Sequence, residues 1–142
     1  MNDWPVWMRV VLKNDPAVLD ILPAGENGIY AAGSLKGPPD KKPFLVVHTD
    51  SDARGPFPGM GLTLMSIHAH DEPGSYNRVR LLLHRARQAL AGAALEQAVK
   101  GTGAEAGGFC RWLNDSADLA DEGFKTIVRT SQYQLTGADG DD

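Results

Sequence analysis

The sequence is short of cysteine, of net positive charge and of long apolar runs, and each shortage narrows what the protein can be. Cys110 is the only cysteine, which excludes an internal disulfide and a cysteine-rich zinc site. We expect its side chain to be a small buried hydrophobe rather than a reactive thiol. The formal net charge of -4 argues against a general nucleic-acid coat, because such binding needs an extensive basic surface.

No apolar run is long enough to cross a bilayer, and the first ten residues lack the basic start and apolar core of a signal peptide. The sequence therefore predicts a soluble protein made in a cytoplasm, with no membrane contact.

Most catalytic motifs are also missing. No serine lies in a Gly-x-Ser-x-Gly elbow, and the glycine-rich segment 101–108 lacks the lysine and hydroxyl of a phosphate loop. We therefore expect no catalytic residue, metal or cofactor, and we interpret 101–108 as a flexible connection. One enzymatic alternative stays open, a small metal-dependent hydrolase that uses His48, His68 and His70. On a strand, His68 and His70 would project from the same face.

The 142 residues suit a single domain over 1–136 with a disordered acidic tail over 137–142. Short helices are predicted from Trp4 to Leu12, with Asp3 as cap and Pro5 in the first turn, and near residues 15–22, where Asp15 and Pro16 supply the start. The long helix spans residues 75–92, with a possible continuation to 100, and ends before the glycine-rich segment.

Strand signals come from alternating or β-branched runs. Residues 44–49 form the clearest strand, and 60–70 fits a central strand covered on both faces. Residues 109–113 and 124–135 are also predicted strands, 29–32 is a short candidate, and 114–122 is predicted to be an acidic turn with one helical loop. This order predicts an α+β fold, a mainly antiparallel sheet with one long helix packed across it and short N-terminal helices.

The long helix has two faces that differ in character. An apolar stripe at three- and four-residue spacing indicates packing on a core; it consists of Val79, Leu82, Leu83, Ala86 and Leu90. Half of the chain's eight arginines lie elsewhere on this helix, at positions 78, 80, 85 and 87. Leu81 lies beside them, which makes this side a candidate protein contact or, equally, a solvated basic face.

The C-terminal third is acidic, with eight acidic residues after Gly103 against three basic ones. The arginine-bearing helix and this segment could meet within one subunit or between identical neighbours in a ring. The candidate subunit interface consists of Arg78, Leu81, Arg85, Asp115, Asp118, Asp121 and Glu122.

Basic residues also occur in the two loops that flank the strand at 44–49. They could face DNA in a channel, or they could be ordinary solubilising charge. These candidate lumen residues are Lys36, Lys41, Lys42 and Arg54.

Three stretches together carry a family resemblance. They are Asp15-Pro16-Ala17-Val18-Leu19, then Ile67-His68-Ala69-His70-Asp71 with the helix segments at 77–83 and 89–90, and Val128-Arg129-Thr130-Ser131-Gln132-Tyr133-Gln134-Leu135. In their order they resemble the tail-terminator or tail-completion proteins of long-tailed bacteriophages, the lambda-type terminator group.

This resemblance implies a structural virion protein that closes into a ring, typically of six subunits, on the last layer of the tail tube. Such a ring ends tube polymerisation and joins the tail to the head connector, while genomic DNA passes through its lumen. The implied partners are further copies of the chain, the major tail tube protein and a head completion or stopper protein, and assembly would take place in the host cytoplasm. A head completion or stopper protein beneath the portal is the alternative position in the virion.

Overall fold

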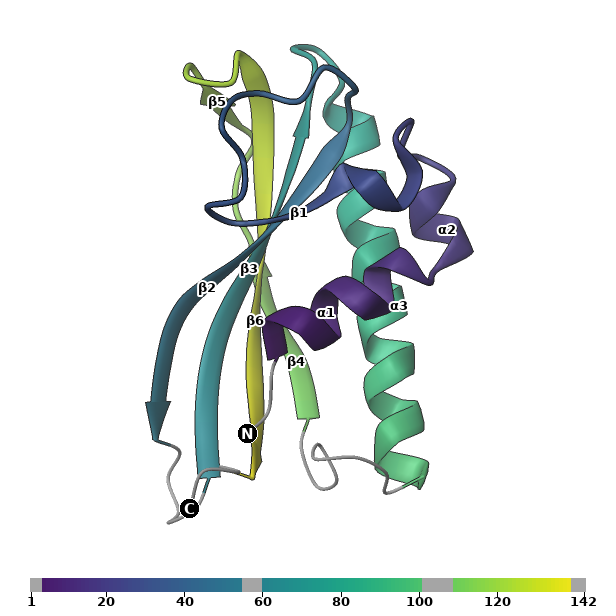
Figure 1. Ribbon diagram of the computed structural model, residues 1–142, viewed down its shortest axis with the longest axis vertical. Helices are drawn as coiled ribbons and strands as arrows, with labels where there is room; N and C mark the ends of the chain where they lie inside the picture. The colour runs from purple at the N-terminus through teal and green to yellow at the C-terminus, as the bar shows by residue number, and fades with distance from the viewer. Residues whose placement is uncertain (1–3, 55–59, 101–108, 139–142) are drawn as a thin grey trace.

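The computed structural model describes residues 4–54, 60–100 and 109–138. It shows an α+β fold in which a six-stranded, mostly antiparallel sheet carries one long helix and short N-terminal helices on one face (Figure 1). The predicted fold class is therefore confirmed.

Two short helices and a 3-10 turn open the described chain: α1 (Trp4–Lys13), α2 (Pro16–Leu19) and η1 (Gly25–Gly28). The Asp15 carboxylate caps α2 by accepting the backbone N–H groups of Ala17 and Val18 at 2.9 and 3.1 Å. This cap satisfies two donors that the first helical turn leaves unpaired, and the helix begins where Asp15 and Pro16 predicted its start. The predicted cap of the first helix, Asp3, lies outside the described residues.

The sheet has the strand order β1-β2-β3-β6-β4, and β5 also pairs with β6. Only β1 and β2 pair in parallel; the other pairs are antiparallel. The strands are β1 (Ile29–Ala31), β2 (Phe44–Arg54), β3 (Met60–Asp71), β4 (Phe109–Asp115), β5 (Leu119–Asp121) and β6 (Thr126–Ala138).

Three segments are more regular than predicted. Strand β2 continues to Arg54 through a bulge between Thr49 and Ser51, because Ser66 and Thr63 on β3 donate hydroxyl hydrogen bonds to its two aspartates. The acidic segment 114–122 contains the end of β4 and strand β5 instead of a helical loop. The predicted disorder is wrong for residues 137 and 138, which pair with β3, and 139–142 lie outside the described residues.

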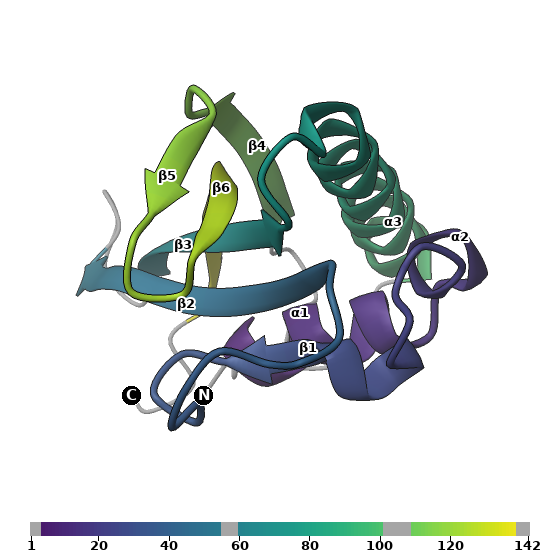
Figure 2. The ribbon, with the colours of Figure 1, turned by 90° about the horizontal axis from the view of Figure 1, so that it is seen from above.

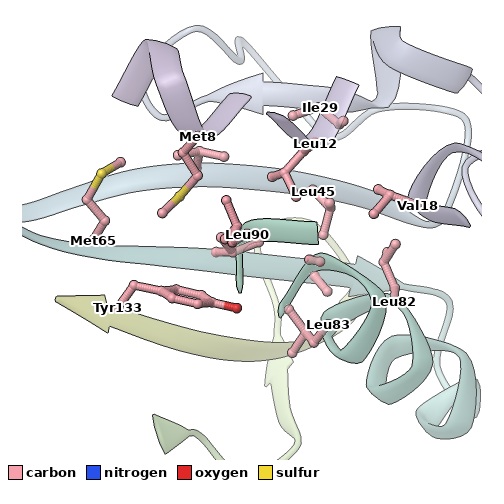
Figure 3. Packing of buried hydrophobic residues seen from close by; sticks show 14 of the residues in the cluster. Met8, Leu12, Val18, Ile29, Leu45, Met65, Leu82, Leu83, Leu90 and Tyr133 are labelled. Atoms are coloured by element: carbon pink, nitrogen blue, oxygen red, sulfur yellow. The ribbon is translucent and has the colours of Figure 1, made fainter. Parts of the chain in front are cut away.

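Helix α3 (Tyr76–Lys100) follows a turn in which Gly74 has a φ of +98°, a conformation that glycine adopts without strain. All five residues of its apolar stripe are buried. In Figure 3, Leu82, Leu83 and Leu90 of this helix point into the same core as Met65 and Tyr133 of the sheet.

Helices α1 and α3 lie on one face of the sheet, and no described helix lies on the other (Figure 2). The prediction that β3 is covered on both faces holds in part, because no described helix lies on the second face but side chains there are buried. Residues 63, 65, 67 and 69 are buried on the helix side. On the helix-free face Ser66 and His70 are also buried, and His68 is partly exposed. Cys110 is partly buried against the helix-side core, and burial raises the pKa of its thiol to about 12, which fits the predicted role as a small hydrophobe.

Candidate functional site

Each of the four arginines of α3 contacts a group of the same chain. Arg78 donates to both carboxylate oxygens of Asp71, with Nη2 lying 2.6 Å from Oδ1. The Asp71 side chain is fully buried, while that of Arg78 is 45% exposed. The hydrogen bond to Asp71 raises the pKa of the Arg78 guanidinium. This pair ties the first turn of α3 to the end of β3.

Arg80 joins α3 to the acidic C-terminal third. Its Nη2 lies 2.9 Å from Oδ2 of Asp118, and Arg129 reaches the other oxygen of the same carboxylate at 3.4 Å. The sequence allowed the arginine-bearing helix and the acidic C-terminal third to meet within one subunit or between neighbours. For Arg80 and Asp118 the structure shows the contact within one subunit.

The two remaining arginines contact α2 and β4. Arg85 donates to the backbone carbonyl of Ala17 at 2.8 Å and lies 3.5 Å from Asp20, which links α3 to the end of α2. The guanidinium of Arg87 lies 3.7 Å from the ring centre of Trp112 on β4, a cation–π geometry.

Some of the predicted interface residues form hydrogen bonds within the chain, whereas others are exposed. Asp115 accepts hydrogen bonds from Trp112 and Ser131, and Asp121 accepts the backbone N–H of Phe124. Leu81 is 44% exposed, and Glu122 is also exposed. Their role in an interface stays a prediction.

A polar row crosses the helix-free face of the sheet. His48, Ser66, Gln132 and Asn114 are aligned on four successive strands. Asp50 lies in the bulge beside them, accepting a hydrogen bond from Ser66 and lying 2.8 Å from Nδ1 of His48. Partial burial opposes ionisation of Asp50, but the hydrogen bonds from Ser66 and His48 outweigh it and keep its pKa below the usual value.

The two histidines of β3 extend this polar face. Nδ1 of His68 lies 3.4 Å from the hydroxyl of Thr130, and the pKa of His68 is lowered by burial and then by the neighbouring His48. His70 is 4% exposed and stacks on Phe44 with 4.8 Å between ring centres. Burial lowers the pKa of His70 to about 4, so this imidazole is neutral at neutral pH.

The three histidines of the hydrolase hypothesis do lie together. The ring centres of His48 and His68 are 5.9 Å apart, and those of His68 and His70 are 6.5 Å apart with the rings stacked. They border a pocket of about 250 Å³ with Leu35 and Phe124. No group of three His, Cys, Asp or Glu side chains suited to a metal ion is present within residues 4–54, 60–100 and 109–138.

The loop between β1 and β2, residues 32–43, carries Lys36, Lys41 and Lys42 and is called the lysine loop. It lies beside the helix-free face, because its Leu35 and the three histidines line the same pocket. Lys36 and Lys41 are exposed and Lys42 is partly exposed, in keeping with either DNA contact or solubilising charge. The side chain of Arg54, the fourth candidate, lies outside the described part of the chain.

Sequence reasoning noticed the histidines but missed the residues that complete the polar face. The available signal was the alternation of polar side chains in Ser66-x-His68-x-His70 and in Thr130-x-Gln132-x-Gln134, a period of two that marks one face of a strand.

Comparison with known proteins gave no assignment: no protein-family model matches the chain, and no curated protein matches it. Among the described residues, no helix is both long and apolar enough to cross a membrane.

Proposed function

We propose that this chain is a structural virion protein of the tail-terminator type, which closes into a ring, typically of six, at the end of a phage tail tube. The resemblance in the sequence suggested this function, and the α+β fold is compatible with it. The ring would end tube polymerisation and dock to a head completion protein, and DNA would pass through its lumen.

The observation that carries the proposal is the difference between the two faces of the sheet. One face packs on α1 and α3 through the core, while the other carries no helix of the described chain and bears polar side chains along β3 and β6. A sheet of this kind suits a position between a protein layer and water. In a ring, the polar face would line the lumen and the helices would lie outside it.

The charges of the helix-free face fit the passage of DNA. The two central strands bear no lysine or arginine there: the side chains are His, Ser and Leu on β3 and Thr, Gln and Val on β6. Tight binding to DNA comes from neutralised phosphates, so a wall whose two central strands bear no cation, with Arg111 only on the outer strand β4, would hold the duplex weakly and let it move. The nearby lysine loop, with Lys36, Lys41 and Lys42, would then lie at the rim, where weak attraction could centre the duplex.

Sedimentation velocity in low and high salt, combined with electron microscopy of the purified protein, tests the proposal. The expected result is a closed ring with a visible lumen, and the same protein in assembled tails. A chain that stays monomeric at all concentrations and is also absent from tails would refute it.

A further inference from the structure

Apart from the three-residue strands β1 and β5, the described part of the sheet has two unpaired edge segments. Strand β1 pairs only with residues 45–47 of β2, so no described strand pairs with the outer edge of β2 at 50–54. At the other end of the strand order, β4 pairs with β6 alone among the described strands, which leaves its outer edge open along 109–115. Open edges present unsatisfied backbone donors and acceptors and are templates for pairing with another chain.

The directions of these edges suit pairing between copies. Strands β2 and β3, β3 and β6, and β6 and β4 are each antiparallel, so β2 and β4 run in opposite directions. A rotation about an axis roughly along the strands keeps every strand direction. The β2 edge of one copy would therefore meet the β4 edge of the next in the antiparallel arrangement that the rest of the sheet uses.

The two edges also lie at the same level of the sheet. Ser51, Leu64, Gln134 and Arg111 form one row, and the bulges of the two edge strands both lie next to the row of Met65 and Tyr133. Bulges increase local twist and bend a strand. Because both edges bend at one level, a neighbouring copy turned about the ring axis presents an edge with the matching bend.

On the helix-free face the two edge strands carry one charge of each sign. Asp50 of β2 is exposed and accepts a hydrogen bond from Ser66 on that face, and Arg111 of β4 is exposed and donates to the neutral Gln134 at 3.4 Å. Opposite charges on one face favour β2 meeting β4 over β2 meeting β2.

We propose that, in the ring, residues 50–54 of β2 pair antiparallel with β4 of a second copy, so that the subunits share one continuous sheet. This inference rests on the proposed function and names its subunit contact. The contact is head to tail, because each copy uses β2 on one side and β4 on the other.

Disulfide trapping in a Cys110→Ser background tests this pairing. Ser51→Cys is combined with Arg111→Cys or with Asn114→Cys. All three positions are exposed, and register places them on the helix-free face. Arg111→Cys tests a pairing of the two edges without stagger, and Asn114→Cys tests a staggered pairing. Either double variant is expected to give a ladder of covalent oligomers on a non-reducing gel after mild oxidation. Each single variant should run as a monomer on the same gel, because like edges do not meet and no covalent link can form.

Hydrogen–deuterium exchange on the unmodified protein gives an independent measurement. Amides of 50–54 and 109–115 should exchange at least tenfold more slowly in the ring than in the dilute monomer, with the exposed surface amides of α1 as the control. If rings form but neither double variant links and exchange at both edges is unchanged, the edge pairing is wrong and the ring proposal stands. If Ser51→Cys alone gives dimers, the contact joins like edges, and if no ring forms, both proposals fail.

Discussion

The pair formed by Arg78 and Asp71 makes the most decisive prediction, because it asks whether the α3 arginines stabilise the subunit itself. The Asp71 carboxylate is fully buried and accepts hydrogen bonds from Arg78 and from the backbone N–H of Glu72. Replacing Arg78 with Met keeps an unbranched aliphatic stem and removes the guanidinium and its charge. Among the described residues, the buried carboxylate would then retain only the Glu72 amide as a hydrogen-bond donor.

The expected loss follows from the burial of Asp71. Removing one partner of a buried ion pair costs about 3–5 kcal/mol, since the other charge is left uncompensated. The Arg78 side chain is 45% exposed, so water can reach part of the vacated space. We therefore expect Arg78→Met to lower the free energy of unfolding by about 2–3 kcal/mol, below the range for a wholly buried pair.

Urea unfolding followed by circular dichroism measures this loss, and Arg80→Met is the matched control on the same helix. Asp118 keeps Arg129 at 3.4 Å when Arg80 is removed, and the Arg80 side chain is 56% exposed. The control should therefore lose less than about 1 kcal/mol. Equal small losses in both variants would refute the reasoning and would make Arg78 a better candidate for a contact between copies.

Three further predictions concern stability and pH. Because burial lowers the pKa of His70 to about 4, the unfolded chain binds the extra proton first as pH falls, so stability should drop from about pH 6.5 to pH 4 by up to about 3 kcal/mol. His70→Phe should flatten this slope in pH-dependent urea titrations, and a slope equal to that of the parent would contradict the reasoning. Leu90 is fully buried in the core, so Leu90→Ala should lower the free energy of unfolding by about 2–5 kcal/mol. Leu81→Ala should change the free energy of unfolding of the monomer by less than about 0.5 kcal/mol. If Leu81 lies in an interface, the same variant should weaken assembly in sedimentation. Asp15→Ala removes the α2 cap and should lower the thermal midpoint by the equivalent of about 1 kcal/mol, and a midpoint unchanged from the parent would show that tertiary packing alone holds α2.

The elements that periodicity and capping determine could be predicted from the sequence. The apolar stripe of α3 fixed which side of the helix enters the core, and Asp15 followed by Pro16 fixed the start of α2. These signals are local, so one sequence is enough to find them.

The engagement of the arginines could not be predicted, because their partners are distant in the sequence. Arg80 and Asp118 are 38 residues apart, and Arg85 and Ala17 are 68 residues apart. A helical pattern shows that a side chain leaves the core stripe, but it does not show which loop or strand end the fold brings against it.

The same limit explains the length of β2. Asp50 and Asp52 have low strand propensity, and in the sequence they resemble a turn. In the fold they are accepted within the strand because hydroxyls of Ser66 and Thr63 on β3 reach their carboxylates. Register between two strands, which a single sequence does not reveal, therefore decides whether this segment is a loop or an edge.

These two differences bear on how copies of the chain could associate. Since all four α3 arginines already contact groups of their own chain, a contact between copies through that helix would have to replace bonds within the subunit. The free edges of β2 and β4 carry no such cost, because their outer backbone groups pair with no described strand. Edge pairing would satisfy those groups and extend the polar face around the ring, so the longer β2 makes the sheet edges a better subunit contact than the arginine-bearing helix.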